Sequence, residues 1–508
     1  MISRSGGSIM SRIFVVIGVL LVLVASCSKA RNSIKNDTKV SEIKLPGDFA
    51  DCLLADFDGD GLNEIFAMTI DSIGGPDDDS MYPRKGAIAH YSNGGFGDPV
   101  TFDLPPEAIV FDSGDIDSDG NPEILYLAGD GLYAMDYDKA AVSSPEKIIS
   151  QNTVFMVPTA RSVSYWDIFK SGPELSHNYL LLPCFKGITV YEINRGSIDS
   201  IGTITIHHRA GANSGIISET RQLNYLTYSC TLPTIEIADY NGDAIDDIFV
   251  ISPSRIAIYQ GVMGDGFSKV PSYIFKPYNE TPEQLLNAGI QFRVQDINHD
   301  GRSDIIVSRS RGGVIKFQSD IEVYYCKSRG GYDEKPSFSR HITQAAGSAY
   351  LCDFNADNRA DLAIPELQLG IVPLMKMLIL NKLDMTLEIF TQQGGGQYPS
   401  EPNLKKYIAA TVDINAGNIS YDNKLSLAGD FNGDHFTDFL IDSGKGHLQI
   451  YYGAAGSVLS SEPNWNGYIP PALSMITTDI NGDGKDEILA FNAQGSADTR
   501  LIRVVWVQ

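Results

Sequence analysis

Basic side chains are scarce in this sequence. Its 508 residues include 39 Lys and Arg against 63 Asp and Glu, which gives a formal net charge of −24 at pH 7. Proteins that bind nucleic acid through its phosphates need a basic surface, so this deficit argues against nucleic acid as the main partner. Common catalytic signatures are missing as well. The sequence has no GxSxG, HExxH or phosphate-loop motif, and we predict no catalytic residue.

Cysteine is also sparse. Apart from Cys27, the chain contains Cys52, Cys184, Cys230, Cys326 and Cys352. An odd number of cysteines without close pairs does not form a disulfide framework. We expect all five to be structural residues, and a single bridge among them stays open without an assignable pair.

The one long apolar run lies near the N-terminus. It extends from Ile13 to Val24 and follows Arg4 and Arg12. Its 12 residues are too few to span a hydrocarbon core, which takes about 20 residues. They are typical of the apolar region of an export signal.

The end of this run, Val24-Ala25-Ser26-Cys27, resembles the lipobox of bacterial lipoproteins. The resemblance implies that residues 1–26 are a signal peptide, that Cys27 carries acyl chains, and that residues 27–37 are a polar tether. An ordinary cleaved signal with an incidental cysteine is the alternative. The residue after Cys27 is Ser28, which resembles the residue found there in lipoproteins that are sorted to the outer membrane. Whether the protein faces the periplasm or the cell exterior stays open.

Seven short acidic segments share one pattern. Each has Asp at position 1, Asp or Asn at position 3, Asp at position 5, and Asp or Glu at position 9. Solvated turns also favour Asp and Asn, but turn chemistry does not require oxygen-bearing side chains at four alternating places. The alternation directs several oxygens toward one centre, and the backbone carbonyl of position 7 can add another. Such an all-oxygen shell suits Ca²⁺ better than Mg²⁺.

We therefore predict about seven Ca²⁺ sites. Their candidate ligands at positions 1, 3, 5, 7 and 9 are Asp56, Asp58, Asp60, Leu62 and Glu64; Asp115, Asp117, Asp119, Asn121 and Glu123; Asp239, Asn241, Asp243, Ile245 and Asp247; Asp296, Asn298, Asp300, Arg302 and Asp304; Asp353, Asn355, Asp357, Arg359 and Asp361; Asp430, Asn432, Asp434, Phe436 and Asp438; and Asp479, Asn481, Asp483, Lys485 and Glu487. Position 6 should turn sharply with a positive φ, and Ala244 is the poorest fit there.

The residues after each acidic segment exclude an EF-hand. That motif needs Glu at position 12 and then a helix. Here positions 10 to 12 form a short apolar run, from Ile65-Phe66-Ala67 in the first copy to Ile488-Leu489-Ala490 in the last. Position 2 is also apolar in every copy. Each acidic loop is therefore predicted to join two buried strands.

The spacing of the loops predicts the architecture. Successive first aspartates lie 59, 124, 57, 57, 77 and 49 residues apart. The 124-residue gap has room for a degenerate repeat, with Ser164–Ile168 as its incoming strand, Asn178–Pro183 as its outgoing strand, and a metal-free segment Lys170–His177 between them. Eight units of about four short strands suggest the blades of a propeller. The last unit lacks a fourth strand, which Val40–Leu45 can supply by closing the ring.

We therefore predict an all-β fold, a single β-propeller of about eight four-stranded blades over residues 38–508. The repeated DxDGDGxxE/D signature resembles the FG-GAP/VCBS family of calcium-binding β-propellers, to which integrin α-subunit heads belong. Phe96-Gly97 and Gly453-Ala454 match the weaker FG and GAP parts. Members commonly have seven blades, so eight is a departure.

This resemblance implies a non-enzymatic module that binds a protein or a glycan and touches the membrane only through its lipid anchor. Two alternatives stay open. One is an enzyme, since some polysaccharide lyases resemble this protein in being calcium-bearing propellers of eight blades. The other is a shell or scaffold component related to the propellers of Rhs/Tc-type toxins.

Overall fold

The computed structural model divides the chain into two units, Met1–Asp37 and Thr38–Gln508. It describes residues 38–508 except 72–82, 93, 156–162, 207, 216–222, 231, 265, 279–287, 314–315, 369–371, 374, 377–381, 412, 416–417, 421–424, 444–445, 456–457, 471, 473, 493–497 and 508. The predicted signal peptide, Cys27 and the tether lie outside the described residues. Within the described part, no helix is long and apolar enough to cross a membrane.

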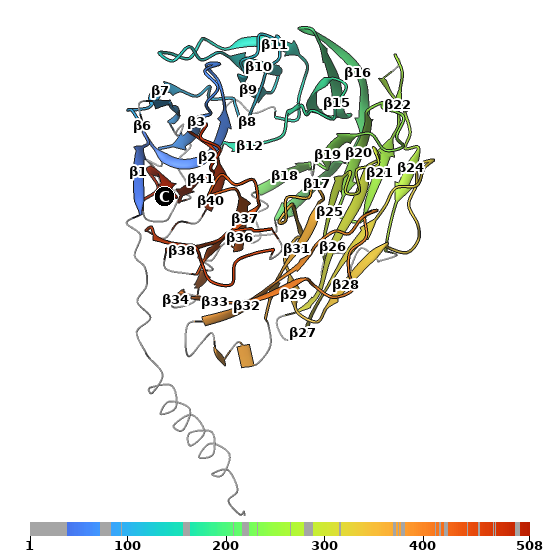
Figure 1. The fold of residues 1–508 in the computed structure, drawn as a ribbon. Helices are drawn as coiled ribbons and strands as arrows, with labels where there is room; N and C mark the ends of the chain where they lie inside the picture. Colours follow the sequence, from blue (N-terminus) through green and yellow to red (C-terminus); the bar gives the residue numbers. More distant parts are fainter. Residues whose placement is uncertain are drawn as a thin grey trace, which may run out of the picture. The chain divides into compact units, whose positions relative to one another are not determined.

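The unit from Thr38 to Gln508 is a β-propeller of eight blades, as predicted (Figure 1). The first four blades contain β2 (Asp48–Ala55), β3 (Glu64–Ile70), β4 (Arg84–Ala89) and β7 (Val100–Asp103); β8 (Val110–Gly114), β9 (Glu123–Ala128), β10 (Gly131–Met135) and β11 (Glu146–Ser150); β13 (Phe169–Lys170), β14 (Asn178–Cys184), β15 (Gly187–Asn194) and β16 (Ser197–Thr205); and β19 (Thr234–Ala238), β20 (Asp247–Ser252), β21 (Arg255–Tyr259) and β24 (Tyr273–Phe275).

The next four blades complete the ring. They contain β25 (Ala288–Gln295), β26 (Asp304–Gly313), β27 (Lys316–Tyr324) and β28 (Phe338–Ile342); β29 (Ala345–Ala346) with β30 (Tyr350–Cys352), β31 (Asp361–Leu367), β32 (Lys382–Phe390) and β33 (Leu404–Thr411); β36 (Leu425–Gly429), β37 (Asp438–Asp442), β38 (His447–Tyr451) and β39 (Trp465–Tyr468); and β40 (Ser474–Thr478), β41 (Glu487–Phe491), β42 (Leu501–Trp506) and β1 (Lys39–Lys44).

The N-terminal strand closes the eighth blade. β1 pairs antiparallel with β42, from Lys39 opposite Trp506 to Lys44 opposite Leu501. This pairing confirms the predicted closure. It satisfies the backbone groups of β42 that would otherwise form an open sheet edge.

Four short hairpins lie outside the blades. They are β5 (Tyr91–Ser92) with β6 (Gly95–Phe96), β17 (His208–Gly215) with β18 (Leu223–Cys230), β22 (Gly261–Val262) with β23 (Gly266–Phe267), and β34 (Asp413–Asn415) with β35 (Asn418–Ser420). The first and third of them follow the third strand of their blades directly.

The hydrophobic core lies between neighbouring blades. Phe57 and Phe66 of the first blade pack with Phe111 and Tyr126 of the second, and the rings of Phe66 and Phe111 are 6.0 Å apart. Because a central strand contacts blades on both sides, its side chains on both faces are apolar. All seven residues of β3 are buried accordingly. The apolar side chain at position 2 of every acidic loop is buried as well.

The described cysteine side chains form no disulfide. Cys52, Cys184 and Cys326 are free and buried, and Cys352 is free and half-buried. Burial raises the pKa of the Cys52 thiol to about 12, which is typical of a structural cysteine. The side chain of Cys230 lies outside the described residues.

The third blade corrects one predicted strand. Ser164–Ile168 was predicted as its incoming strand, but Ser164–Tyr165 (β12) pairs in parallel with β8 of the second blade, and the incoming strand is β13. Two carboxylates hold the segment in which the chain passes from β12 in the second blade to β13 in the third. Asp51 Oδ2 accepts the N–H of Tyr165, and Asp112 Oδ2 accepts the N–H of Ile168. The predicted outgoing strand is present as β14.

Candidate metal centres

Each acidic loop connects the innermost strand of a blade to the second strand, as predicted. The first loop joins β2 to β3, and the last joins β40 to β41. The inner strands of a propeller all run in the same direction along its axis. All seven loops therefore lie at one end of the propeller.

The seven loops share one set of four hydrogen bonds. The position 9 carboxylate accepts the N–H of position 2 at 2.7 to 3.1 Å, and the position 1 carboxylate accepts the N–H of position 6 at 2.7 to 3.1 Å. Position 3 accepts the N–H of position 5 at 2.9 to 3.1 Å. Position 5 accepts the N–H of position 7 at 2.7 to 3.1 Å. These bonds direct all four side chains inward.

Two residues of each loop adopt the left-handed backbone conformation. Position 6 has a positive φ in every loop, as predicted, including Ala244 with a φ of 60°. Position 4 has a positive φ in every loop too, which sequence reasoning missed, although glycine occurs there in four copies. The two left-handed residues fold the backbone around the inward-directed oxygens.

Position 4 also lies close to the next loop. A methyl group added to Gly59 would come within 2.1 Å of Asn121 Oδ1, and one added to Gly482 within 2.9 Å of Leu62 Cδ2. In both pairs the second residue is position 7 of the following loop. Backbone bonds join loops in the same order, since the N–H of Ser303 donates to the Asp239 carbonyl at 2.9 Å. Contacts of these two kinds therefore link the loops of the eighth and first blades, of the first and second, and of the fourth and fifth.

The position 9 carboxylates have raised pKa values. Burial raises the pKa of Glu123, Asp247, Asp304, Asp438 and Glu487 to about 7 and that of Asp361 to about 6, and it also raises the pKa of Glu64. The backbone N–H of position 2 opposes this effect. The acids at positions 1 and 5 add to it in the four loops with Asp at position 9 and in the Glu487 loop. Seven buried carboxylates beside other acids are an arrangement that a bound cation would stabilise.

The donor set of the loops fits Ca²⁺. Ligand oxygens of Ca²⁺ lie 2.3–2.6 Å from the ion, so oxygens on opposite sides of it are about 5 Å apart. Ligand atoms of Asp115, Asp117, Asp119 and Glu123 all lie within 4.8 Å of one another, as do those of Asp56, Asp58 and Asp60. Among the described acidic, His and Cys residues, the other five loops contain no such group of three. Their position 3 is Asn, whose amide oxygen takes the carboxylate's place in the hydrogen bond to position 5.

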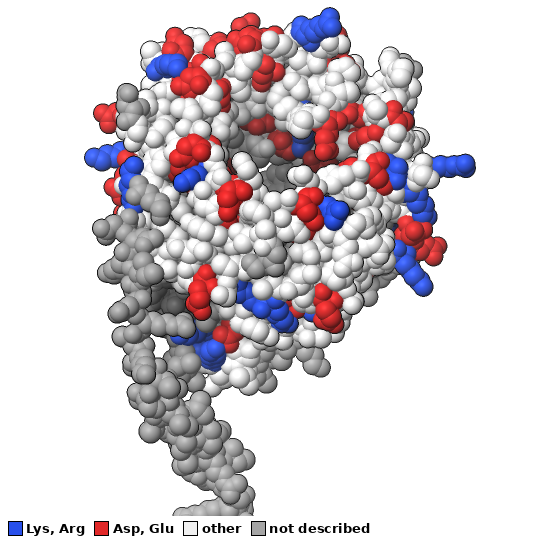
Figure 2. Space-filling view, viewed as in Figure 1, with Lys and Arg blue, Asp and Glu red and all other residues white. Residues whose placement is uncertain are grey.

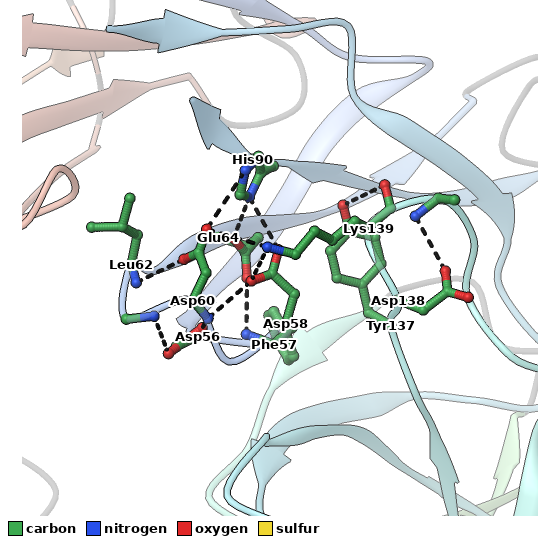
Figure 3. A network of polar contacts seen from close by, with 12 residues as sticks. Asp56, Phe57, Asp58, Asp60, Leu62, Glu64, His90, Tyr137, Asp138 and Lys139 are labelled. Carbon is green, nitrogen blue, oxygen red and sulfur yellow. Dashed lines mark hydrogen bonds and ion pairs between the residues drawn. The ribbon is translucent and has the colours of Figure 1, made fainter. Parts of the chain in front are cut away.

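The first loop has two nitrogen-bearing neighbours that the sequence analysis did not identify (Figure 3). His90 Nδ1 lies 2.8 Å from Glu64 Oε1 and 3.2 Å from Asp58 Oδ2. Lys139 from the second blade places Nζ 3.2 Å from Asp58 Oδ1 and 3.4 Å from Asp60 Oδ2. Neither residue belongs to an acidic segment, so the repeat pattern carried no signal for them.

The third blade replaces a loop-to-loop contact with side chains. Asp246 is position 8 of the fourth blade's acidic loop. Its Oδ2 accepts the N–H of Ser176 at 2.9 Å and the hydroxyl hydrogen of Tyr179 at 2.7 Å. The Ser176 hydroxyl donates to the same oxygen at 2.6 Å. That the segment Lys170–His177 binds no metal stays a prediction.

Comparison with known proteins identifies one repeat. Residues 239–307, which contain the loops that start at Asp239 and Asp296, match the FG-GAP-like repeat. No curated protein sequence matches the chain.

Several solved structures are similar in fold at low sequence identity. A lectin from Agrocybe aegerita that recognises non-reducing terminal N-acetylglucosamine is 11% identical, with a TM-score of 0.39, over 73% of this chain and 90% of the lectin. The Photorhabdus luminescens Tc holotoxin pore is 12% identical, with a TM-score of 0.30, over 88% of this chain and 17% of that one. The V. cholerae biofilm matrix protein Bap1 is 11% identical, with a TM-score of 0.30, over 88% of this chain and 78% of that one.

Proposed function

This chain is an eight-bladed β-propeller with FG-GAP-like repeats, and we propose that it is a calcium-binding module of the cell envelope that binds a protein or a glycan. In this proposal Ca²⁺ stabilises the propeller, Cys27 anchors it to the outer membrane through acyl chains, and the ligand contacts the propeller near its axis. The membrane contact is limited to the anchor.

The shared hydrogen-bond frame of the seven loops supports the role of calcium. Positions 1, 3, 5 and 9 of these loops hold 23 of the chain's 63 acidic side chains. The hydrogen bonds bring these carboxylates close together at the ends of buried strands. Without a counter-ion the carboxylates repel one another. Bound Ca²⁺ turns this repulsion into attraction, and its binding free energy adds to the stability of the folded state.

A polar cluster at the propeller axis supports the binding role. β12 forms the inner edge of the second blade, and its residue Tyr165 is 46% exposed. The Tyr165 hydroxyl donates to Asp167 Oδ1 at 3.0 Å. The Lys170 ammonium contacts Asp167 and lies 3.2 Å from Glu236 Oε2. An exposed aromatic ring among charged groups suits a ligand that has both apolar faces and hydroxyl or amide groups, such as a sugar or a peptide.

The surface around the axis is acidic. Figure 2 shows a hollow near the centre of one face, with more Asp and Glu than Lys and Arg side chains around it. A surface of this charge attracts cationic groups and repels free polyanions. The proposal therefore favours a neutral or basic glycan or peptide, or an acidic one that is bridged by Ca²⁺.

A binding screen tests this function. The mature protein is applied to a glycan array and to envelope extracts, with Ca²⁺ and with chelator, as wild type, Tyr165→Ala and Tyr468→Ala. Tyr468 is the matched control, because it is 54% exposed and lies on the outer strand β39. We expect at least about a tenfold loss of binding for Tyr165→Ala only. Equal binding by both variants contradicts the proposed site, and release of an unsaturated, ultraviolet-absorbing sugar product favours the lyase alternative.

A further inference from the structure

The first acidic loop differs from the other loops in what surrounds its position 9 carboxylate. In the loops of the fourth to seventh blades, the second oxygen of this carboxylate accepts a backbone N–H, for example from Gly261 to Asp247 at 2.7 Å and from Gly453 to Asp438 at 2.8 Å. In the first loop that place is taken by the ring nitrogen of His90, 2.8 Å from Glu64 Oε1. A donor that can only give a hydrogen is thus replaced by one that can also bind a metal.

Two carboxylate oxygens in this loop share a single hydrogen-bond partner. Asp58 Oδ1 accepts the N–H of Asp60, and Glu64 Oε2 accepts the N–H of Phe57. The remaining oxygens, Asp58 Oδ2 and Glu64 Oε1, both face His90 Nδ1, and a single N–H can bond only one of them well. Asp58 Oδ2 is buried without a hydrogen-bond partner, in a side chain that is 1% exposed.

We propose that Asp58 Oδ2, Glu64 Oε1 and His90 Nδ1 form a mixed nitrogen–oxygen site for a transition-metal ion of the zinc type. In this proposal such an ion takes the place of Ca²⁺ in the first loop, while the other six loops keep their all-oxygen donors. Ligand atoms of these three residues lie within 4.8 Å of one another. Two ligands at tetrahedral angles, each about 2.0 Å from Zn²⁺, are about 3.3 Å apart. The distances from His90 Nδ1, 3.2 Å to Asp58 Oδ2 and 2.8 Å to Glu64 Oε1, are close to that spacing.

The chemistry of the donors determines the kind of ion. Imidazole nitrogen is a preferred ligand of Zn²⁺ and similar ions, whereas Ca²⁺ and Mg²⁺ select oxygen donors. The other ring nitrogen of His90, Nε2, lies 3.8 Å from Asp60 Oδ2. A carboxylate on the far side of a metal-bound imidazole orients the ring and raises its basicity. Asp60 would supply this support only after its side chain moves closer to Nε2, since 3.8 Å is longer than a hydrogen bond.

Lys139 sets the affinity of this site. Its ammonium lies 3.2 Å from Asp58 Oδ1, on the oxygen that does not face His90. The side chain is 51% exposed and comes from the second blade, so it can move away when a divalent ion binds. A nearby ammonium disfavours a second cation, and we therefore expect its removal to strengthen metal binding.

Zinc binding measured in excess Ca²⁺ tests the proposal. The full chain is titrated with Zn²⁺ against a chromophoric chelator as wild type, His90→Gln, Lys139→Gln and His435→Gln. His435 is the matched control, because it lies in another acidic loop with a side chain that is 91% exposed. We expect one Zn²⁺ per wild-type chain. Affinity should fall at least about 100-fold in His90→Gln, rise in Lys139→Gln and stay constant in His435→Gln.

Two outcomes overturn the inference. One is the same zinc affinity in wild type and His90→Gln, and the other is an equal loss in His90→Gln and His435→Gln. If His90→Gln does not fold, Lys139→Gln still tests the proposal, because the proposal predicts a higher zinc affinity for that variant. Calcium content is measured in the same samples. If the protein binds calcium but no zinc, only the proposed zinc site is refuted. If it binds no calcium, the proposed calcium-binding role is refuted instead.

Discussion

Asp486 in the eighth blade and Asp430 in the seventh exchange two hydrogen bonds. The N–H of Asp486 donates to the Asp430 carbonyl at 2.8 Å, and the N–H of Asp430 donates to Asp486 Oδ2 at 2.8 Å. The first bond has counterparts between Ser303 and Asp239 and between Thr437 and Asp353. Each of these bonds links position 8 of one acidic loop to position 1 of the preceding loop. Order in one loop therefore supports order in its neighbour.

Removing a ligand from a complete loop should remove one metal ion. Asp300 is position 5 of the fifth blade's loop, where it accepts the N–H of Arg302 at 3.1 Å. We expect bound Ca²⁺ to fall by about one per chain in Asp300→Ala. Glu174→Ala is the control, because Glu174 is an exposed acid in the segment of the third blade that is predicted to bind no metal. Atomic emission of calcium-equilibrated protein measures the content, and equal values in the two variants would show that the site is misplaced.

The stability of the metal-free protein should fall as pH rises. Burial raises the pKa of Glu123, Asp247, Asp304, Asp438 and Glu487 to about 7 in the folded state, against about 4 in the unfolded chain. Between these values the folded state holds more protons than the unfolded state, so the free energy of unfolding decreases with pH.

Thermal unfolding measures this dependence. Protein freed of metal should melt at a higher temperature at about pH 5.5 than at about pH 7.5. Added Ca²⁺ should restore the melting temperature at the higher pH, because it binds the deprotonated carboxylates. A metal-free melting temperature that rises over this interval would contradict the burial of these groups.

Position 6 offers a matched pair of backbone substitutions. Ala244 has a φ of 60°, whereas Gly301 occupies the same position of the next loop with a φ of 77°. A methyl group on Gly301 would meet no atom within 4 Å, so its cost is conformational. We expect Ala244→Gly to stabilise the protein by about 0.5–1 kcal/mol and Gly301→Ala to destabilise it by about 1 kcal/mol. The measurement is the midpoint of denaturant unfolding in the presence of Ca²⁺ for each variant. If both substitutions shift this midpoint in the same direction, that is evidence against the left-handed turn.

Closure of the ring should depend on one side chain of β1. Ile43 is buried between the eighth and first blades, while Lys44 beside it is exposed. Ile43→Asp places a carboxylate in this core and should cost at least about 3 kcal/mol. Lys44→Asp adds the same group at the surface and should cost less than about 1 kcal/mol. Similar losses in the two variants would mean that β1 does not bury Ile43.

The anchor has a direct chemical test. In cells given labelled fatty acid, wild-type protein should carry label and fractionate with the outer membrane. Cys27→Ser should lose both properties, because stable anchoring requires more than one acyl chain. Label and membrane association that persist in the variant would show that another element holds the protein.

Much of the fold could be predicted because the acidic loops repeat. Each loop fixes the end of one strand and the start of the next, so seven copies located fourteen strands. The 124-residue gap between two of the loops indicated the eighth blade. The apolar residues at position 2, such as Phe57 and Ile480, also predicted burial correctly. The missing strand of the last unit indicated that β1 would close the ring.

The errors and omissions concern residues without a repeat. The crossing from the second to the third blade depends on Asp51 and Asp112, which bind backbone N–H groups over 100 and 50 residues away in the chain, respectively. His90 and Lys139 reach the first loop from a strand end and from the neighbouring blade. Contacts of this kind depend on how the blades pack, and no local pattern in the sequence records them.

The pairing of β1 with β42 also sets the time course of assembly. Glu42 and Arg503 form an ion pair at 3.1 Å although 461 residues separate them in the chain. During synthesis, β1 must remain unpaired until β42 has emerged, while blades with local contacts can already form. The final step of folding is therefore the docking of the earliest strand onto the latest, and a stalled or truncated chain would expose an unpaired sheet edge to aggregation or proteolysis.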